Sequence, residues 1–295
     1  MNRNLLIIII LLIPLTIISF LKKETNFSLK EEEEPQKIYV PVREGDQINN
    51  IELEDYVIGV VAGEMPALFE IEALKSQAIA ARTYAINHLK SQKSITNTTS
   101  DQVYITKEEM LEKWQDKYDT YYNKISNAVL STKDLIMFYN NEPIKAYYYS
   151  MSNGYTESSL NVFKEENAYL NIIPSPYDGD NSNTITISQQ EFCTNLNIQC
   201  SFIEITNIIK DKSNRISKIT INNKDFTGIE VRKKLSLRST DFQIIKKNNY
   251  LEITTRGYGH GVGMSQHGSN NMAKLGYNYE EILKYYYQNI KIDKL

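Results

Sequence analysis

Histidine, cysteine and tryptophan are scarce in this sequence of 295 residues, which contains three, two and one of them. No H-E-x-x-H or C-x-x-C pattern occurs, so the ligand spacings typical of zinc sites are missing. The phosphate-binding patterns G-x-x-x-x-G-K-[ST] and G-x-G-x-x-G are missing as well. Neither sign of charge dominates, with 33 basic and 36 acidic residues and a net charge of −3. We therefore expect no metal ion, no cofactor and no nucleic-acid partner.

The N-terminus carries the only long apolar run of the chain. Residues 5–21 contain no charge, and two lysines, a glutamate and a threonine follow them. The run is just long enough to span a hydrocarbon core of about 30 Å. No A-x-A pattern of small residues follows, which disfavours the alternative of a cleaved signal peptide. We predict a retained membrane anchor over residues 1–21, a charged linker over 22–37 and a folded domain over 38–295.

Two consecutive helices are predicted directly after the start of the folded domain. The first has valines at helical spacing and ends near Glu64, because Pro66 restrains the preceding residue from helical geometry. The second is rich in alanine, extends from Ile71 to Leu89 and carries Arg82. A carboxylate at a helix end beside one guanidinium is a candidate acid/base pair. The alternatives are a plain helix-end charge for Glu64 and a surface charge for Arg82.

The remainder of the chain mixes helical and strand patterns. Helical spacing covers residues 107–130, and two strands are predicted at 135–139 and 144–149. Short alternating strands recur between residues 201 and 256. We therefore predict an α+β fold, with a helical core that carries Glu64 and flanking antiparallel strands.

A glycine-rich segment, RGYGHGVGMSQHG, extends from Arg256 to Gly268. Its glycines occupy every second position from Gly257 to Gly263. In an extended segment they would leave one face bare, where another backbone, a helix or a sugar ring could lie close. One helix containing Met272 and Leu283 is predicted to follow.

Several of these segments together resemble one known family. They are EDYVIGVVAGEMP, LKSQAIAARTYA, DQVY, AYYYSMSNGYTES and GYGHGVGMSQHGSNNMAKLGYNYEEILKYYY, in this order. The chain from Ile38 to its end is similar to the stage II sporulation protein D family. The resemblance implies a lytic transglycosylase of peptidoglycan glycan strands, anchored in the cell membrane with its catalytic domain extracytoplasmic, at the sporulation septum and the engulfing membrane. It also implies two partners: a sporulation amidase/endopeptidase and a multispanning membrane protein.

The resemblance assigns site residues by position. The catalytic glutamate falls on Glu64, and the arginine of the alanine-rich helix falls on Arg82. The predicted substrate-binding residues are Ser152, Tyr155, His260, Ser265 and Gln266. The chain departs from the family pattern in three places. Tyr149 stands where many relatives have histidine, and Ser152-Asn153-Gly154 stands where many have Ser-Gly-Gly. Ser100-Asp101 stands where some have a His-Cys pair of a zinc site.

A single carboxylate suffices for the implied reaction. The acid protonates the glycosidic oxygen and then takes a proton from the 6-hydroxyl of the sugar, which leaves a 1,6-anhydro end without consuming water. Glu64 needs a raised pKa for the first step. Two other functions stay open: a non-catalytic, peptidoglycan-binding enhancer of an amidase, since the same domain occurs in amidase enhancers, and a zinc peptidase.

The two cysteines, Cys193 and Cys200, are seven residues apart. In an extracytoplasmic domain we expect a local disulfide, with two free thiols as the alternative.

Overall fold

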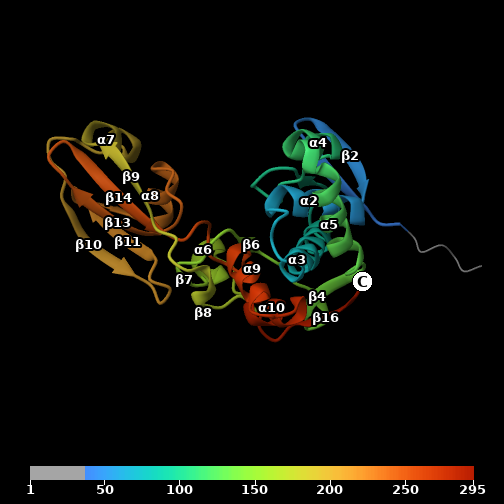
Figure 1. Ribbon diagram of the computed structural model, residues 1–295. Coiled ribbons are helices and arrows are strands. Elements are labelled where there is room, and N and C mark those ends of the chain that lie inside the picture. Colours follow the sequence, from blue (N-terminus) through green and yellow to red (C-terminus); the bar gives the residue numbers. More distant parts are fainter. Residues whose placement is uncertain (1–36) are drawn as a thin grey trace, which may run out of the picture. The chain divides into compact units, whose positions relative to one another are not determined.

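Helix α3 (Ile71–Leu89) lies at the centre of the helical part of the protein (Figure 1). The computed structural model describes residues 37–295, so the predicted anchor and all but the last residue of the predicted linker lie outside the described residues. Within residues 37–295, none of the helices combines the length and the hydropathy of a membrane span. The described residues from Ile38 onward form one α+β unit with two separate hydrophobic cores.

Helix α2 (Leu53–Glu64), which precedes α3 in the chain, ends at the residue that the sequence predicts. Met65 is extended, with φ −121° and ψ 142°, because Pro66 excludes helical geometry from the residue before it. At the other end, the side chain of Glu52 accepts hydrogen bonds from two backbone N–H groups of the first turn. Glu64 is therefore the last helical residue of α2.

Alanines allow α3 to be buried on nearly all sides. It packs against α2, α5 (Tyr118–Leu130), α9 (Gln266–Lys274), α10 (Tyr279–Tyr286) and strand β4 (Leu135–Tyr139). Small side chains let these elements approach the helix axis closely. A charged side chain in the middle of α3 consequently has no route to solvent, which decides the position of Arg82.

Short sheets flank the helices. Sheet β2-β1-β3 lies against α2 and α3, and sheet β16-β4-β5 lies against α3. The two-stranded sheets are the parallel pair β15-β6 and the antiparallel pair β7-β8. The strand bounds are β1 Tyr39–Glu44, β2 Gln47–Glu52, β3 Ile95–Thr96, β5 Glu142–Pro143, β6 Tyr148–Tyr149, β7 Gly154–Tyr155, β8 Pro174–Ser175, β15 Met264–Ser265 and β16 Lys291–Lys294.

Three predicted elements are shorter than the sequence suggests. The helical segment 107–130 is divided into α4 (Lys107–Trp114), the 3-10 helix η1 (Gln115–Lys117) and α5, because Gln115 has a positive φ of 49°. The strand predicted at 144–149 is reduced to the two residues of β6. The single helix predicted after the glycine-rich segment is two helices, α9 and α10, separated at Gly276, whose φ is +95°.

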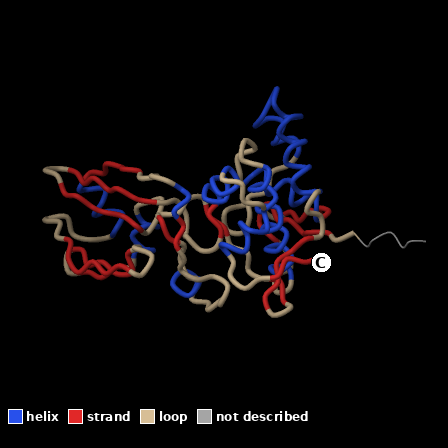
Figure 2. Tube along the Cα trace, turned by 60° about the horizontal axis from the view of Figure 1, so that its bottom comes forward, coloured by secondary structure: helices blue, strands red, loops and turns tan. Residues whose placement is uncertain are grey.

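Residues 183–256 build the second hydrophobic core from strands and two helices (Figures 1 and 2). Two antiparallel sheets, β10-β11-β12 and β13-β14-β9, contribute to it. The elements are β9 Asn183–Ser188, α7 Gln189–Leu196, β10 Ile205–Lys210, β11 Ile216–Ile221, β12 Lys224–Phe226, α8 Gly228–Lys234, β13 Asp241–Lys246 and β14 Tyr250–Arg256. The alternating strands predicted in this region are confirmed.

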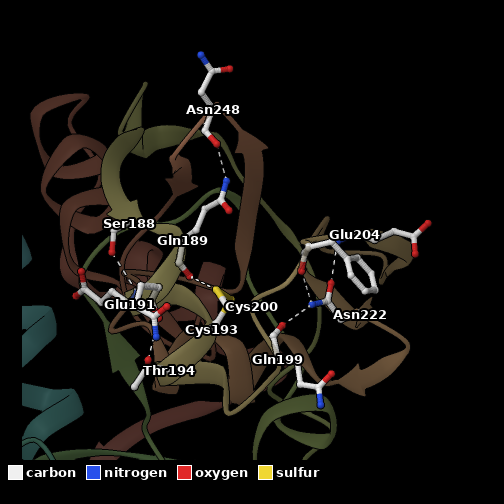
Figure 3. The surroundings of a disulfide bond; sticks show 12 residues. Ser188, Gln189, Glu191, Cys193, Thr194, Gln199, Cys200, Glu204, Asn222 and Asn248 are labelled. Atoms are coloured by element: carbon white, nitrogen blue, oxygen red, sulfur yellow. Dashed lines mark hydrogen bonds between the residues drawn. A yellow bond between two sulfur atoms is a disulfide. The ribbon is translucent and has the colours of Figure 1, made fainter.

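A disulfide joins Cys193 of α7 to Cys200 in the following loop (Figure 3). The two Cα atoms are 5.5 Å apart, within the ordinary range for a bridge. The predicted disulfide is confirmed. In the chain-entropy account, closing so short a loop stabilises the fold by about 2–3 kcal/mol.

Candidate active site

Glu64 is held at the end of α2 by a backbone donor from another segment. Its Oε1 accepts a hydrogen bond of 2.7 Å from the backbone N–H of Val103. The side chain is partly exposed, so the carboxyl is fixed in direction and still accessible. A carboxyl with one oriented oxygen is suited to transfer a proton along a defined line.

Two glycines of α2 allow the segment around Val103 to lie against the helix. A Cβ atom at Gly63 would overlap the carbonyl oxygen of Val103, and one at Gly59 would overlap the ring of Tyr104 and lie 2.8 Å from the carbonyl oxygen of Ile105. The absence of side chains at both positions brings the N–H of Val103 within reach of Glu64. These glycines are part of the site because they allow this close packing, although they have no reactive side chain.

Burial raises the pKa of Glu64 above its usual range. The hydrogen bond from the N–H of Val103 opposes this rise, and so do the nearby side-chain amide of Gln266 and hydroxyl of Tyr148, because each favours the charged carboxylate. None of the groups that shift this pKa is a second carboxylate or a guanidinium. Burial thus favours the protonated form of Glu64, and the neighbouring donors favour the carboxylate.

The structure brings Gln266 to Glu64, as the sequence predicts for one site. The side-chain amide donates to the backbone carbonyl of Glu64 at 3.3 Å and to Oε1 of the buried Gln77 at 3.5 Å. Gln266 opens α9, so two segments that lie 202 residues apart in the chain meet here.

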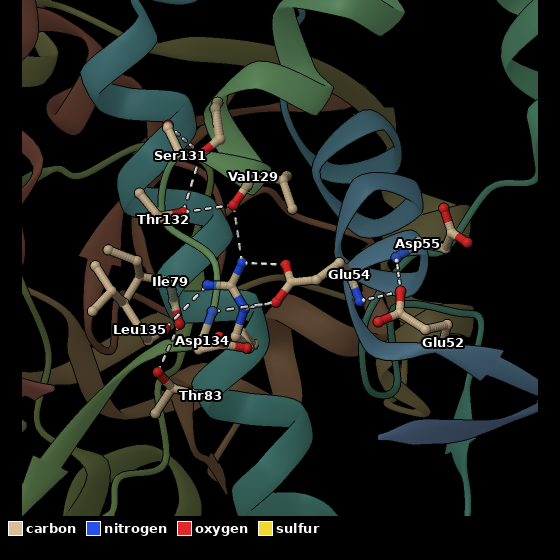
Figure 4. Close-up of polar contacts among 12 residues, drawn as sticks. Glu52, Glu54, Asp55, Ile79, Thr83, Val129, Ser131, Thr132, Asp134 and Leu135 are labelled. Atoms are coloured by element: carbon tan, nitrogen blue, oxygen red, sulfur yellow. Dashed lines mark hydrogen bonds and ion pairs between the residues drawn. The ribbon is translucent and has the colours of Figure 1, made fainter. Parts of the chain in front are cut away.

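Arg82 lies elsewhere, and the prediction that it pairs with Glu64 is wrong. Its guanidinium donates to both carboxylate oxygens of Glu54, from Nε at 2.9 Å and from Nη2 at 2.5 Å. Nη1 and Nη2 also donate to the carbonyl oxygens of Leu135 and Val129 (Figure 4). Arg82 is 0% exposed. Because α3 is covered on nearly all sides, the charge needs a buried partner, and the first turn of α2 supplies it.

The two predicted serines are buried parts of the frame. Ser265 donates to Oδ1 of Asp178 at 2.5 Å and caps the N-terminus of α9. The backbone N–H of Ser152 donates to the same oxygen at 2.9 Å, and its hydroxyl donates to the carbonyl of Tyr155. Their exposed fractions are 0% and 1%, so neither hydroxyl lies on the surface. Burial raises the pKa of Asp178 to about 6.

Tyr155 and His260 occupy different surroundings. The ring of Tyr155 is exposed on β7, where it is available to a ligand. His260 is packed among the rings of Tyr147, Tyr149 and Phe163, and its Nδ1 accepts from the N–H of Val262. Burial and the nearby Arg232 and Arg215 lower the pKa of His260 to about 3, so this imidazole is neutral at ordinary pH.

The glycine-rich segment packs against the chain that carries Tyr148, although it is not extended. The four alternating glycines, from Gly257 to Gly263, all have positive φ values, between 79° and 113°. A Cβ at Gly263 would overlap the carbonyl oxygen of Tyr147, and one at Gly259 would lie 2.8 Å from the Cβ of Tyr149. The prediction that another backbone lies close to the glycines is confirmed, and the prediction of one shared bare face is wrong. Left-handed residues turn the chain at each step instead.

Three residues of the site carry no signal of their own in the sequence. Gln102, Tyr148 and Asp178 are common residue types, and only their contacts reveal them. Gln102 and Tyr148 do stand inside two of the family-like segments. Asp178 lies in a polar loop that shows no pattern.

The region 37–295 shows no arrangement of side chains typical of a metal site. No cluster of three or more histidine, cysteine, aspartate or glutamate side chains in this region is arranged to hold a metal ion. Asp101, at the position of the family's zinc pair, accepts hydrogen bonds from Thr96 and Tyr84 instead.

Comparisons with known proteins give the class of this fold and site. The family described as Stage II sporulation protein matches residues 43–139, which include Glu64, Arg82 and Gln102. Stage II sporulation protein D of Bacillus subtilis (strain 168) is 39% identical over 273 residues, covering 88% of this chain and 80% of that protein. The protein of the same name from Bacillus amyloliquefaciens is 37% identical over 275 residues, covering 89% and 80%. The chain belongs to the stage II sporulation protein D family.

A further relative has a different name. The amidase enhancer of Bacillus subtilis (strain 168) is 29% identical over 288 residues, which cover 78% of this chain and 39% of that longer protein. The shared region therefore occurs in proteins with two described roles.

Proposed function

We propose that this protein is a peptidoglycan lytic transglycosylase that uses Glu64 as its single acid/base. The observation that carries the proposal is the environment of Glu64: a partly exposed carboxyl with a raised pKa, oriented by the N–H of Val103. The groups that shift its pKa include no other carboxylate.

The reaction divides into two proton transfers at one carboxyl. Protonated Glu64 donates to the oxygen between MurNAc and GlcNAc while the bond from that oxygen to C1 of MurNAc breaks. The carboxylate then accepts the proton of the MurNAc 6-hydroxyl, whose oxygen bonds to C1. The products are a free GlcNAc 4-hydroxyl and a 1,6-anhydro MurNAc end, so no water is consumed and Glu64 returns to its protonated state.

The biological setting in this proposal is thinning of the septal wall and engulfment during sporulation. Membership of the family supports it. The proposed partners are glycan strands, a sporulation amidase/endopeptidase and a multispanning membrane protein of the engulfment complex. Similarity to the amidase enhancer is consistent with an amidase partner.

A second candidate is a non-catalytic enhancer that binds glycan and stimulates an amidase. The relative named as an amidase enhancer favours it. The two candidates differ in the products that the protein alone releases from glycan.

Product analysis separates them. Purified protein is incubated with peptidoglycan, and the soluble fragments are examined by mass spectrometry. Catalysis gives fragments that end in 1,6-anhydro MurNAc. Absence of such fragments, together with faster release of peptides when an amidase is added, supports the enhancer and contradicts the transglycosylase.

The proposed location is the cell membrane, with residues 1–21 as a retained anchor and the folded domain outside the cytoplasm. We expect the mature chain to keep its N-terminal residues and to sediment with membranes, because the apolar run has no small-residue cleavage site after it. N-terminal sequencing of the fractionated protein measures this. A soluble mature chain that begins near residue 25 would contradict it.

Gly63→Ala tests the support beneath Glu64. The new Cβ would overlap the carbonyl of Val103, so the segment must move and its N–H leaves the carboxyl. We expect a loss of about 1–3 kcal/mol in the free energy of unfolding, as for overpacking, and a large loss of cleavage in the protein that remains folded.

Gly228→Ala is the matched control, because a Cβ there overlaps the carbonyl of Ile216 in the second core. It is expected to reduce stability comparably while the folded protein keeps its cleavage rate. Equal loss of cleavage in both variants would show that general destabilisation, and not the position of Val103, is responsible.

A further inference from the structure

A chain of hydrogen bonds leads from the middle of α2 to the neighbourhood of Glu64. The hydroxyl of Tyr56 is 3.0 Å from Oε1 of Gln102, and Nε2 of Gln102 is 2.9 Å from the hydroxyl oxygen of Tyr148. Tyr56 and Gln102 are both 0% exposed, whereas Tyr148 is partly exposed beside Glu64. A fully buried amide therefore holds a tyrosine that stands near the proposed catalyst.

The direction of these bonds follows from the chemistry of the groups. A glutamine Oε1 can only accept and its Nε2 can only donate, whereas a hydroxyl has one proton to donate. Tyr56 therefore donates to Gln102, and Gln102 donates to Tyr148. The single proton of Tyr148 is left free for another acceptor. Val103, the residue after Gln102, bonds to the Glu64 carboxyl, and the Tyr148 hydroxyl lies close enough to that carboxyl to favour its charged form.

We propose that Gln102 is a positioning residue whose amide holds the Tyr148 hydroxyl as a hydrogen-bond donor to the Glu64 carboxylate. This inference rests on the proposed function of Glu64. Gln102 touches neither substrate nor the reacting atoms, and acts through Tyr148. Stabilising the carboxylate favours the first step, in which Glu64 gives up its proton. It counteracts the burial of Glu64, which by itself favours the protonated form.

Glutamine suits this task better than its isosteres. Glutamate at 102, when ionised, has no donor for Tyr148, so the Tyr148 proton would turn toward residue 102 and away from Glu64. Methionine has a similar length and no hydrogen-bond donor, so it leaves the hydroxyl free to rotate. Gln102→Met therefore removes the direction of the bond while keeping most of the packing.

The tyrosines and the aspartate near this chain of hydrogen bonds keep their charge state through the neutral range. Burial raises the pKa of Tyr148 and of Tyr56 above its usual range, and Tyr84 and Tyr104 are raised too. The pKa of Asp101 is lowered by hydrogen bonds from Thr96 and Tyr84 and by His88, against the effect of burial. These tyrosines stay protonated and Asp101 stays ionised, so the carboxyl chemical shift of Glu64 reports on Glu64 itself.

The experiment is a pH titration of the Glu64 carboxyl, followed by ¹³C NMR on the full chain with ¹³C-labelled glutamate. The Glu64→Gln variant identifies the Glu64 resonance, because that resonance is missing from its spectrum. For Gln102→Met we expect the titration midpoint of Glu64 to rise by about one pH unit. This is the size expected when a charged group loses one hydrogen bond. In the cleavage assay, the alkaline limb of the pH–rate profile should shift to higher pH by about one unit. We expect kcat to fall about tenfold. An unchanged midpoint in folded protein would overturn the proposal.

A double-mutant comparison with Tyr148 shows whether Gln102 acts through the Tyr148 hydroxyl or through a general structural effect. Tyr148→Phe should raise the Glu64 midpoint by itself, and adding Gln102→Met to it should change the midpoint little further, because Gln102 acts through the missing hydroxyl. Additive shifts would contradict the proposal. Tyr287→Phe is the matched control, since this buried tyrosine donates to the carbonyl of Tyr147 and should leave the midpoint unchanged.

If Gln102→Met does not fold, Tyr56→Phe replaces it. This variant leaves the amide of Gln102 in place and removes the donor that fixes its orientation, so a smaller shift in the same direction is expected. The NMR readout needs no glycan. A shifted midpoint without any anhydro product in the wild type would keep Gln102 as a positioning residue for Glu64 and contradict only the transglycosylase.

Discussion

Replacing Glu64 by glutamine is expected to lower the release of 1,6-anhydro fragments by at least about a hundredfold, the usual scale of general acid/base catalysis. Glutamine keeps the length of the side chain, and its Oε1 can still accept the hydrogen bond from the N–H of Val103. It can neither donate a proton to the glycosidic oxygen nor take one from the 6-hydroxyl. Mass analysis of digests of purified peptidoglycan measures the effect.

Two controls accompany the Glu64→Gln variant. Its midpoint of unfolding should match the wild type closely, because the carboxyl is partly exposed and its hydrogen bond is retained. Glu165→Gln removes an exposed carboxylate that pairs with Lys145 and should cleave glycan at the normal rate. If Glu64→Gln releases anhydro fragments as fast as the wild type, Glu64 is not the catalyst.

Replacing Arg82 by methionine is expected to lower the free energy of unfolding by about 3–5 kcal/mol, the scale for breaking a buried ion pair by removing one partner. The carboxylate of Glu54 would remain buried without its partner, and the carbonyl oxygens of Val129 and Leu135 would each lose a donor. Urea unfolding measures this loss. Activity should fall only as far as the folded fraction falls.

The partner and an exposed pair supply the controls for Arg82. Adding Glu54→Leu to Arg82→Met removes the uncompensated charge and should restore part of the lost stability. Lys145→Met breaks the exposed pair with Glu165 and should cost less than about 1 kcal/mol. A folded, stable Arg82→Met protein without cleavage would instead support a direct catalytic role for Arg82.

Local sequence determined the position of Glu64 along the chain. The valine pattern and the restraint that Pro66 imposes on Met65 end α2 at Glu64, and both act within a few residues. The spacing of Cys193 and Cys200 likewise allowed a bridge that needs only a short loop to close. The α+β class follows from the same local patterns, and the order of the motifs indicates the family because it does not depend on how the elements pack.

Only the tertiary structure decided which side chains meet. Arg82 lies 18 positions after Glu64 but pairs with Glu54, because packing around α3 buries its charge and the first turn of α2 presents a carboxylate there. Tyr148, Gln102 and Gln266 reach Glu64 or each other across 46 to 202 positions of sequence. Such contacts depend on the packing of several elements at once, which glycines such as Gly63 permit. The sequence by itself thus determined where the acid stands, and the packing of the fold determined which groups set its protonation.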